Sequence, residues 1–274
     1  KRLNIRITIM TDLPYYHVDA FADRPFTGNQ AAVMPLDAWL DDAVLQAIGE
    51  ENNFAETAFT IPDATGEADY ELRWFTPAVE IRLCGHATLA SGHILLQQFP
   101  DKDRITFRTR KAGILEVRRE GDGYAVALPA IPTDSVDIPE MMVAIGGKPL
   151  AMRRNPDHYN VFRYATAEEI LALKPDMKAL AAFGDDSFTA TAPGTDTDVV
   201  SRVFVPGAGV DEDSVTGSAH AVLTPYWAAE LGRNEFTAHQ ASSRGGYLGC
   251  RLDGDRAWLS GKCVTVVKGT FSLG

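Results

Sequence analysis

The stretch WFTPAVEIRLCGHATLA, residues 74 to 90, has a counterpart later in the chain, VFVPGAGVDEDSVTGSAHAVL, residues 203 to 223. Each contains Phe-x-Pro, an irregular loop, and then a glycine that opens an Ala-rich helix. The two glycines, Gly85 and Gly217, are 132 residues apart (217 − 85 = 132), close to half of the 274-residue chain. A repeat at this spacing predicts two halves of similar fold.

A second pair of matching stretches supports the same duplication. GILEVRREGDGYAVAL, residues 113 to 128, and GYLGCRLDGDRAWLSG, residues 246 to 261, are separated by 133 positions (246 − 113 = 133). Both alternate apolar and polar residues around a Gly-Asp pair, which is typical of a β-hairpin. Chance sharing of turn chemistry is the alternative, but the coincidence of several features at one offset argues against it.

Helix signals also occur in both halves. TAEEILAL has the capping-box spacing at Thr166 and Glu169. DAWLDDAVLQAIGEE predicts an earlier helix with Asp37 as its N-cap. The apolar stripe of that helix would be Leu40, Ala43, Val44, Ala47 and Ile48. Each half therefore follows the order strand, helix, strands, loop, helix, hairpin.

We expect an α+β fold of two pseudo-symmetric domains, residues 11–128 and 129–274, with the active site in the cleft between them. The last strand is free to return to the first domain. The proline-containing stretch LPAIPTDSVDIPEMM, residues 128 to 142, predicts an extended linker. The initial KRLNIRITIM is interpreted as an extension or leader rather than a signal peptide, and Met10 as a candidate start.

Charge and cysteine content narrow the classes of partner. The net charge is −11 and there is no long basic run, which argues against nucleic acid or an anionic membrane surface as partner. No apolar run approaches the roughly 18–20 residues that a membrane span needs. The three cysteines, Cys84, Cys250 and Cys263, are widely spaced, which favours free thiols in a reducing cytoplasm.

The two glycine turns are a candidate binding site. A glycine between a loop and a helix leaves backbone N–H groups free at the positive end of the helix dipole. Two such turns facing each other would hold a carboxylate or a developing negative charge. Ordinary tight turns, capped by Ser218 or His86, are an equally good reading of the residues alone.

Acidic residues supply two further candidate functional positions. Glu56, in NNFAETAF, lies in a strand that is otherwise apolar and neutral, so it is either exposed or desolvated in a cleft and suited to proton transfer. The corresponding strand of the second half, DDSFTATAP, has no carboxylate within it. The run Asp211, Glu212 and Asp213 is more typical of a solvated loop than of a calcium site.

Metal and thiol chemistry are both disfavoured. His86 and His93 are seven residues apart, which is longer than the i, i+4 spacing of zinc-binding helices. Cys84 and His86 are two apart on a turn, where side chains seldom align for proton transfer. We therefore expect no metal site and no Cys–His nucleophile here.

Five motifs together resemble the PhzF family, the phenazine-biosynthesis-like proteins of the diaminopimelate epimerase superfamily. They are HVDAFADRPFTGNQAAV (17 to 33), NNFAETAF, RWFTPAVEIRLCGHATLASG, DEDSVTGSA and HQASSRGG, and the resemblance runs from about Tyr15 to the end. It implies two domains, each a β-barrel-like sheet wrapped around a central helix, and a homodimer. It also implies catalysis that needs no cofactor and no metal.

The resemblance implies roles for individual residues. Glu56 matches the family's catalytic glutamate and would be the general acid/base, with His86 and Asp213 as hydrogen-bond partners of the substrate. The residues implied to bind the substrate and its carboxylate are Asn29, Gly85, Gly217 and Ser218. In the family's best-understood member the glutamate moves a proton along a dihydro-hydroxyanthranilate ring.

The chain departs from related patterns at several positions. Ala55 replaces a common serine, and Ala241 and Gly245 replace a common glycine and proline. The racemases of the superfamily use two thiols, but Thr216 stands opposite Cys84, and a hydroxyl is a much poorer acid/base. Three hypotheses result: an isomerase of a small carboxylate-bearing metabolite, a non-catalytic small-acid binding protein, and an amino-acid racemase or epimerase that uses Cys84.

Overall fold

The computed structural model describes residues 11–274, so the predictions for KRLNIRITIM and Met10 lie outside the described residues. In the first half the elements are β1 (Thr11–Ala20), β2 (Asn29–Pro35), α1 (Asp42–Asn52), β3 (Glu56–Pro62), β4 (Tyr70–Phe75), β5 (Glu80–Ile81), α2 (Gly85–Gln98), β6 (Arg104–Thr109), β7 (Ile114–Glu120) and β8 (Gly123–Pro129).

The second half has the same mixed α+β character. Its elements are β9 (Asp134–Val136), α3 (Pro139–Ile145), β10 (Ala151–Arg154), β11 (Tyr159–Arg163), α4 (Ala167–Ala172), α5 (Met177–Ala181), β12 (Ser187–Pro193), β13 (Val199–Val205), the short 3-10 helix η1 (Pro206–Ala208), β14 (Val210–Asp213), α6 (Gly217–Leu231), β15 (Glu235–Gln240), β16 (Gly246–Asp253), β17 (Arg256–Gly261) and β18 (Cys263–Leu273). Within residues 11–274, no helix is both long and apolar enough to cross a bilayer.

The two repeated hairpins are confirmed. β7 pairs with β8 around Gly121 and Asp122, and β16 pairs with β17 around Gly254 and Asp255. The glycines have φ values of 58° and 59°, which a side chain would strain. A glycine at the first central position suits a two-residue hairpin turn. The matching Gly-Asp pairs therefore have the same physical role in both halves.

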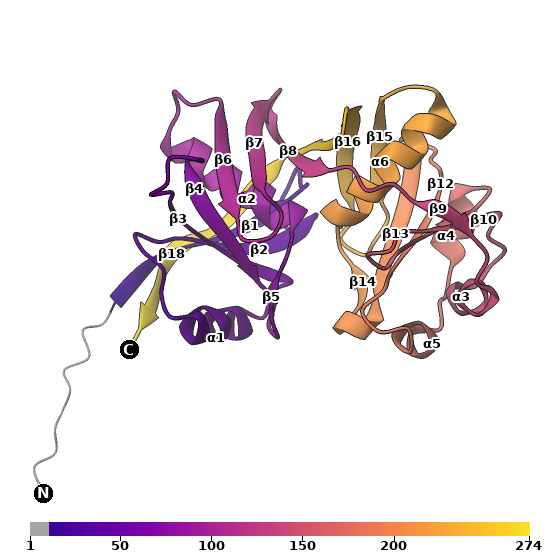
Figure 1. The fold of residues 1–274 in the computed structure, drawn as a ribbon, viewed down its shortest axis with the longest axis horizontal. Helices are drawn as coiled ribbons and strands as arrows, with labels where there is room; N and C mark the ends of the chain where they lie inside the picture. The colour runs from indigo at the N-terminus through magenta and orange to yellow at the C-terminus, as the bar shows by residue number, and fades with distance from the viewer. Residues whose placement is uncertain (1–10) are drawn as a thin grey trace, which may run out of the picture.

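Strand pairing connects the beginning, middle and end of the chain. β18 runs antiparallel to β1 along its whole length, from Leu273 opposite Thr11 to Cys263 opposite Ala20. β17 pairs with β8, so the two hairpins lie next to each other. Figure 1 shows the resulting two lobes, with the C-terminal strand lying beside β1 in the lobe built from the first half. A division of the chain at residues 128 and 129 stays a prediction.

Each lobe surrounds one buried helix. α2 contacts β1, β2, β3, β6, β7 and β8, and every residue from Gly85 to Leu96 is buried. α6 contacts β8, β11, β16 and β17. Both helices combine apolar residues with buried polar ones such as Thr88, Ser91 and Thr224, whose hydroxyls donate to the carbonyl four residues earlier. Leu89 of α2 and Leu223 of α6 belong to the same apolar core, which is therefore continuous between the lobes.

Two local predictions were wrong. α1 begins at Asp42, so Asp37 is not its N-cap, and the helix buries Leu45, Ile48 and Gly49 while Ala43 and Ala47 are exposed. The stretch 128–142 is not a continuous linker, because β9 and the start of α3 lie within it. Pro139 begins α3, where the missing N–H costs no helical hydrogen bond. The capping box of Thr166 and Glu169 is confirmed in α4.

The N-termini of α2 and α6 are in direct contact. A Cβ atom added to Gly85 would lie 2.9 Å from the Cα of Gly217, and one added to Gly217 would lie 2.8 Å from the Cα of Gly85. Backbone cannot give way as a flexible side chain can. Only glycine at both positions permits this approach.

Gly85→Ala should therefore force the two helix ends apart. We expect a loss of about 1–3 kcal/mol in the free energy of unfolding, the usual cost of overpacking. Thermal unfolding of the purified variant measures it. Gly269→Ala is the control, because a Cβ there meets no atom within 4 Å. Equal unfolding temperatures for both variants would contradict the account of this contact.

Candidate functional site

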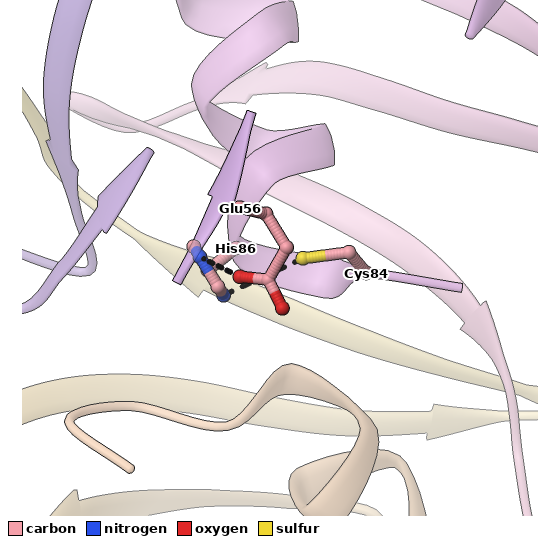
Figure 2. A group of neighbouring side chains, drawn as sticks. All are labelled: Glu56, Cys84 and His86. Carbon is pink, nitrogen blue, oxygen red and sulfur yellow. Dashed lines mark hydrogen bonds and ion pairs between the residues drawn. The ribbon is translucent and has the colours of Figure 1, made fainter. Parts of the chain in front are cut away.

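Glu56 and His86 form the centre of the candidate site. Glu56 begins β3, and His86 is the second residue of α2. Glu56 Oε2 lies 2.9 Å from His86 Nε2, and the two side chains are 16% and 5% exposed. Figure 2 shows the Glu56 carboxylate turned toward the imidazole ring. Both atoms are buried, and among residues 11–274 neither has a hydrogen-bond partner with standard angles. The contact is thus a buried ion pair between a carboxylate and an imidazole.

Asn29 joins this pair to the second half of the chain. Its Nδ2 donates to Asp213 Oδ1 and to the Val215 carbonyl, both at 2.9 Å. The same nitrogen lies 3.3 Å from His86 Nδ1. The structure therefore brings together Asn29, Glu56, His86 and Asp213, although they come from four different elements.

Asp213 is held by donors from its own half. Ser214 N donates to Oδ1 at 2.8 Å, and the Thr216 hydroxyl donates to Oδ2 at 2.6 Å. The buried Gln240 accepts from Thr216 N and donates to the Asp213 carbonyl, each at 2.8 Å. The acidic run is thus divided: Asp213 lies in the site, while Glu212 pairs with Arg202 at 2.8 Å. Gln240 was not foreseen, and only its place in HQASSRGG could have pointed to it.

Cys84 contacts His86, contrary to the expectation that their side chains would not align. Cys84 Sγ lies 3.5 Å from His86 Nδ1, since the extended backbone of Cys84 precedes the first turn of α2. Burial raises the pKa of the Cys84 thiol to about 11, and the nearby Glu56 charge acts in the same direction. Cys84 is therefore protonated near neutral pH. It is a poor nucleophile because the thiolate, not the thiol, is the reactive form.

The charged groups of the site shift one another's pKa values. Burial opposes protonation of His86, but Cys84 and the Glu56 carboxylate outweigh burial and raise its pKa above 6.5. With Cys84 protonated, Glu56 is the partner that we hold responsible for this shift. Burial raises the pKa of Asp213, while the charge of His86 and the donors Thr216 and Asn29 act against that rise. The site thus favours a charged imidazole beside the Glu56 carboxylate.

Glu56, Cys84 and His86 also bring three potential metal ligands within 4.8 Å of one another. Their types suit zinc. However, Glu56 lies against Nε2 of the imidazole and Cys84 against Nδ1. The two ring nitrogens point in different directions, and Cys84 is a protonated thiol near neutral pH, whereas a metal binds the thiolate. The donor set does not fit a metal centre without rearrangement.

The helix N-termini offer backbone donors beside these side chains. Within residues 11–274, the N–H groups of Gly85, His86, Gly217 and Ser218 donate to no other protein atom. The residues before the helices, Cys84 and Thr216, make no side-chain cap, so neither Ser218 nor His86 serves as one. These N–H groups are free to bind an anion.

The site is closed. A groove of about 790 Å³ is lined by Arg244, Tyr247 and Lys262 among others and contains none of the predicted site residues. The contact between Gly85 and Gly217 leaves no space between the helix ends.

The model of the phenazine biosynthesis-like protein family, PhzC-PhzF, matches residues 18–269. A Pseudomonas aeruginosa protein named as an uncharacterized isomerase is 44% identical over 263 residues, which cover 96% of this chain and all of that protein. The crystal structure of a PhzF-family protein from Enterococcus faecalis has a TM-score of 0.88 and 38% identity, covering 96% of this chain and 100% of that one.

A more distant structure shares the fold alone. A hydroxyproline epimerase from Agrobacterium vitis has a TM-score of 0.64 at 10% identity, covering 98% of this chain and 94% of that one. The α+β architecture around two buried helices is thus common to phenazine biosynthesis-like proteins and epimerases. The resemblance noted from the motifs is confirmed: the chain belongs to the phenazine biosynthesis-like protein family.

Proposed function

We propose that this protein is an isomerase that moves a proton within a small carboxylate-bearing metabolite, with Glu56 as the general acid/base. The single observation that carries the proposal is the close approach of Glu56 Oε2 to His86 Nε2, both buried and without aligned hydrogen bonds. A buried ion pair is costly to desolvate, and a carboxylate beside an imidazole is a common arrangement for proton transfer. Several relatives are named as isomerases, which supports the same class of reaction.

The reaction needs one group that both removes and returns a proton. The Glu56 carboxylate takes a proton from one carbon of the substrate, and the electron pair of that C–H bond moves into the neighbouring conjugated system. Glu56 then returns the proton to another carbon, so that a double bond has moved and no atom is gained or lost. A positively charged His86 stabilises the carboxylate before the transfer and the developing negative charge during it.

The substrate's carboxylate would bind where the two helices begin. The free N–H groups of His86 and Ser218 lie at the positive ends of α2 and α6. Asn29, Asp213 and the Ser218 hydroxyl remain as partners for its other polar groups. We further expect the protein to act as a homodimer in the cytoplasm, in a biosynthetic reaction.

Two alternatives make different predictions. A non-catalytic binding protein would bind small acids without exchanging their hydrogens. A racemase would need a second base opposite Cys84, but the Thr216 hydroxyl donates to Asp213 and Cys84 itself is a buried, protonated thiol. These observations favour the isomerase over the two-thiol racemase.

Glu56→Gln should lower turnover by about 10³-fold, because the amide cannot carry the proton. We would incubate the protein in deuterated water with candidate acids, dihydro-hydroxyanthranilate first, and measure deuterium uptake by mass spectrometry. Glu51→Gln is the control, since Glu51 is an exposed residue of α1. Uptake at the wild-type rate by Glu56→Gln would overturn the role of Glu56. Saturable binding by the wild type without uptake would favour the binding protein.

Cys84 should be dispensable for the chemistry. We expect Cys84→Ala to keep turnover within about tenfold of wild type, which is a change of about 1.4 kcal/mol in the activation barrier.

Iodoacetamide near neutral pH should leave Cys84 unmodified in the folded protein and modify all three cysteines after unfolding, because each has a pKa raised by burial. Complete loss of turnover in Cys84→Ala would instead support thiol chemistry.

A further inference from the structure

An ion pair between Asp19 and Arg244 connects the two halves of the chain. Neither residue takes part in the proposed proton transfer. Asp19, in β1, is 1% exposed, and its Oδ1 accepts from Arg244 Nη2 at 2.8 Å. Arg244 lies in the loop between β15 and β16, and its side chain is 22% exposed. A buried carboxylate without a partner is strongly destabilising, so Asp19 requires this guanidinium.

The same guanidinium holds the loop that follows β1. Arg244 Nε donates to the Gly28 carbonyl at 2.8 Å, and Nη2 donates to the Thr27 carbonyl at 3.0 Å. Next to it, Gly28 N donates to the Gly245 carbonyl at 2.7 Å. Asp19 Oδ2 accepts from Phe26 N at 2.8 Å. Three successive residues of the loop are thus held through Arg244, Gly245 and Asp19, with the planar fork of arginine making several bonds at once.

This loop would not keep its shape unaided. Phe21 and Phe26 have φ values of 55° and 72°, which bulky side chains rarely adopt. Gly28 has a φ of 65°, and a Cβ there would lie 2.2 Å from the Ala20 carbonyl oxygen. Strained backbone persists only where its surroundings hold it. Arg244 provides part of those surroundings, together with Asp19, Gly245 and the Lys262 carbonyl.

The loop ends at Asn29, whose amide contacts three groups of the site. It donates to Asp213 and to the Val215 carbonyl, and it lies 3.3 Å from His86 Nδ1. Asn29 and Cys84 both lie against Nδ1 of the ring, so they fix the orientation of the imidazole in which Nε2 faces Glu56. The position of Asn29 therefore determines how His86 meets Glu56.

We propose that Arg244 is a positioning residue for the reaction: it fixes the 21–28 loop so that Asn29 holds His86 and Asp213 in place. The proposal rests on the proposed function for its effect on turnover, but not for its geometry. Arg244 makes no contact with Glu56, His86 or Asp213 within the described residues. Its influence passes through Asn29.

The first experiment needs no substrate. Protein carrying nitrogen-15-labelled histidine would give ring signals for His86, assigned with His86→Gln. Arg244→Ala should shift those signals, and millimolar guanidinium should restore them by entering through the groove that Arg244 lines. Methylammonium, which lacks the planar fork, should not. Arg24→Ala is the control, because it removes an exposed positive charge from the same groove.

The second experiment measures turnover by deuterium uptake from dihydro-hydroxyanthranilate. Arg244→Ala should lower kcat by about 100-fold with little change in KM, the typical effect of a misplaced catalytic group, and guanidinium should restore it. The double variant Arg244→Ala with Asn29→Ala should lower kcat little more than Asn29→Ala alone, because Arg244 acts through Asn29. Arg244→Lys, which keeps the charge and loses the fork, provides a milder variant if Arg244→Ala does not fold.

The outcomes separate the two claims. Unchanged His86 signals in folded Arg244→Ala or Arg244→Lys, or full additivity with Asn29→Ala, would overturn the positioning role. Shifted and rescued His86 signals support it. If the wild type takes up no deuterium from any acid, the isomerase proposal fails, and the His86 signals still decide whether Arg244 positions the site.

Discussion

The contact between Gly85 and Gly217 is the constraint on which the site depends. Each glycine begins a buried helix, one in each lobe, and the two backbones meet with no side chain between them. This approach places His86, next to Gly85, near Asp213 and Thr216, which lie just before Gly217. The amide of Asn29 then joins the halves by donating from one to the other. A bulkier residue at either glycine would separate groups that must work together.

The two helix ends have similar backbones, but their side chains differ. The first carries Cys84 and His86 and faces Glu56, while the second carries Thr216 and Asp213 tied into a network with Gln240. Thr216 stands where a second thiol would be needed, and its hydroxyl is used to hold Asp213. One half thus carries the group proposed to transfer the proton, and the other offers polar partners and backbone donors. A single acid/base suits movement of a proton within one molecule better than inversion between two bases.

Patterns of neighbouring residues in the sequence correctly predicted the elements of the fold that depend on local interactions. The Gly-Asp hairpins, the capping box of Thr166 and the glycine-initiated helices follow from turn and helix chemistry, and the structure has all of them. The start of α1 was misplaced because Asp41, not Asp37, is its N-cap, and packing against Phe75 selects the buried face. The contact of Cys84 with His86, the role of Gln240 and the ion pair of Asp19 with Arg244 depend on tertiary contacts. No spacing along the chain encodes those contacts.

The central claim is that the two helix ends hold a carboxylate while Glu56 reaches the carbon skeleton of the same molecule. A crystal structure of Glu56→Gln with dihydro-hydroxyanthranilate bound tests it most directly. The account predicts the ligand's carboxylate within hydrogen-bonding distance of the His86 or Ser218 N–H groups, with the residue 56 side chain against a ring carbon. A ligand bound instead in the groove beside Arg244 and Lys262, away from Glu56 and the helix ends, would contradict it.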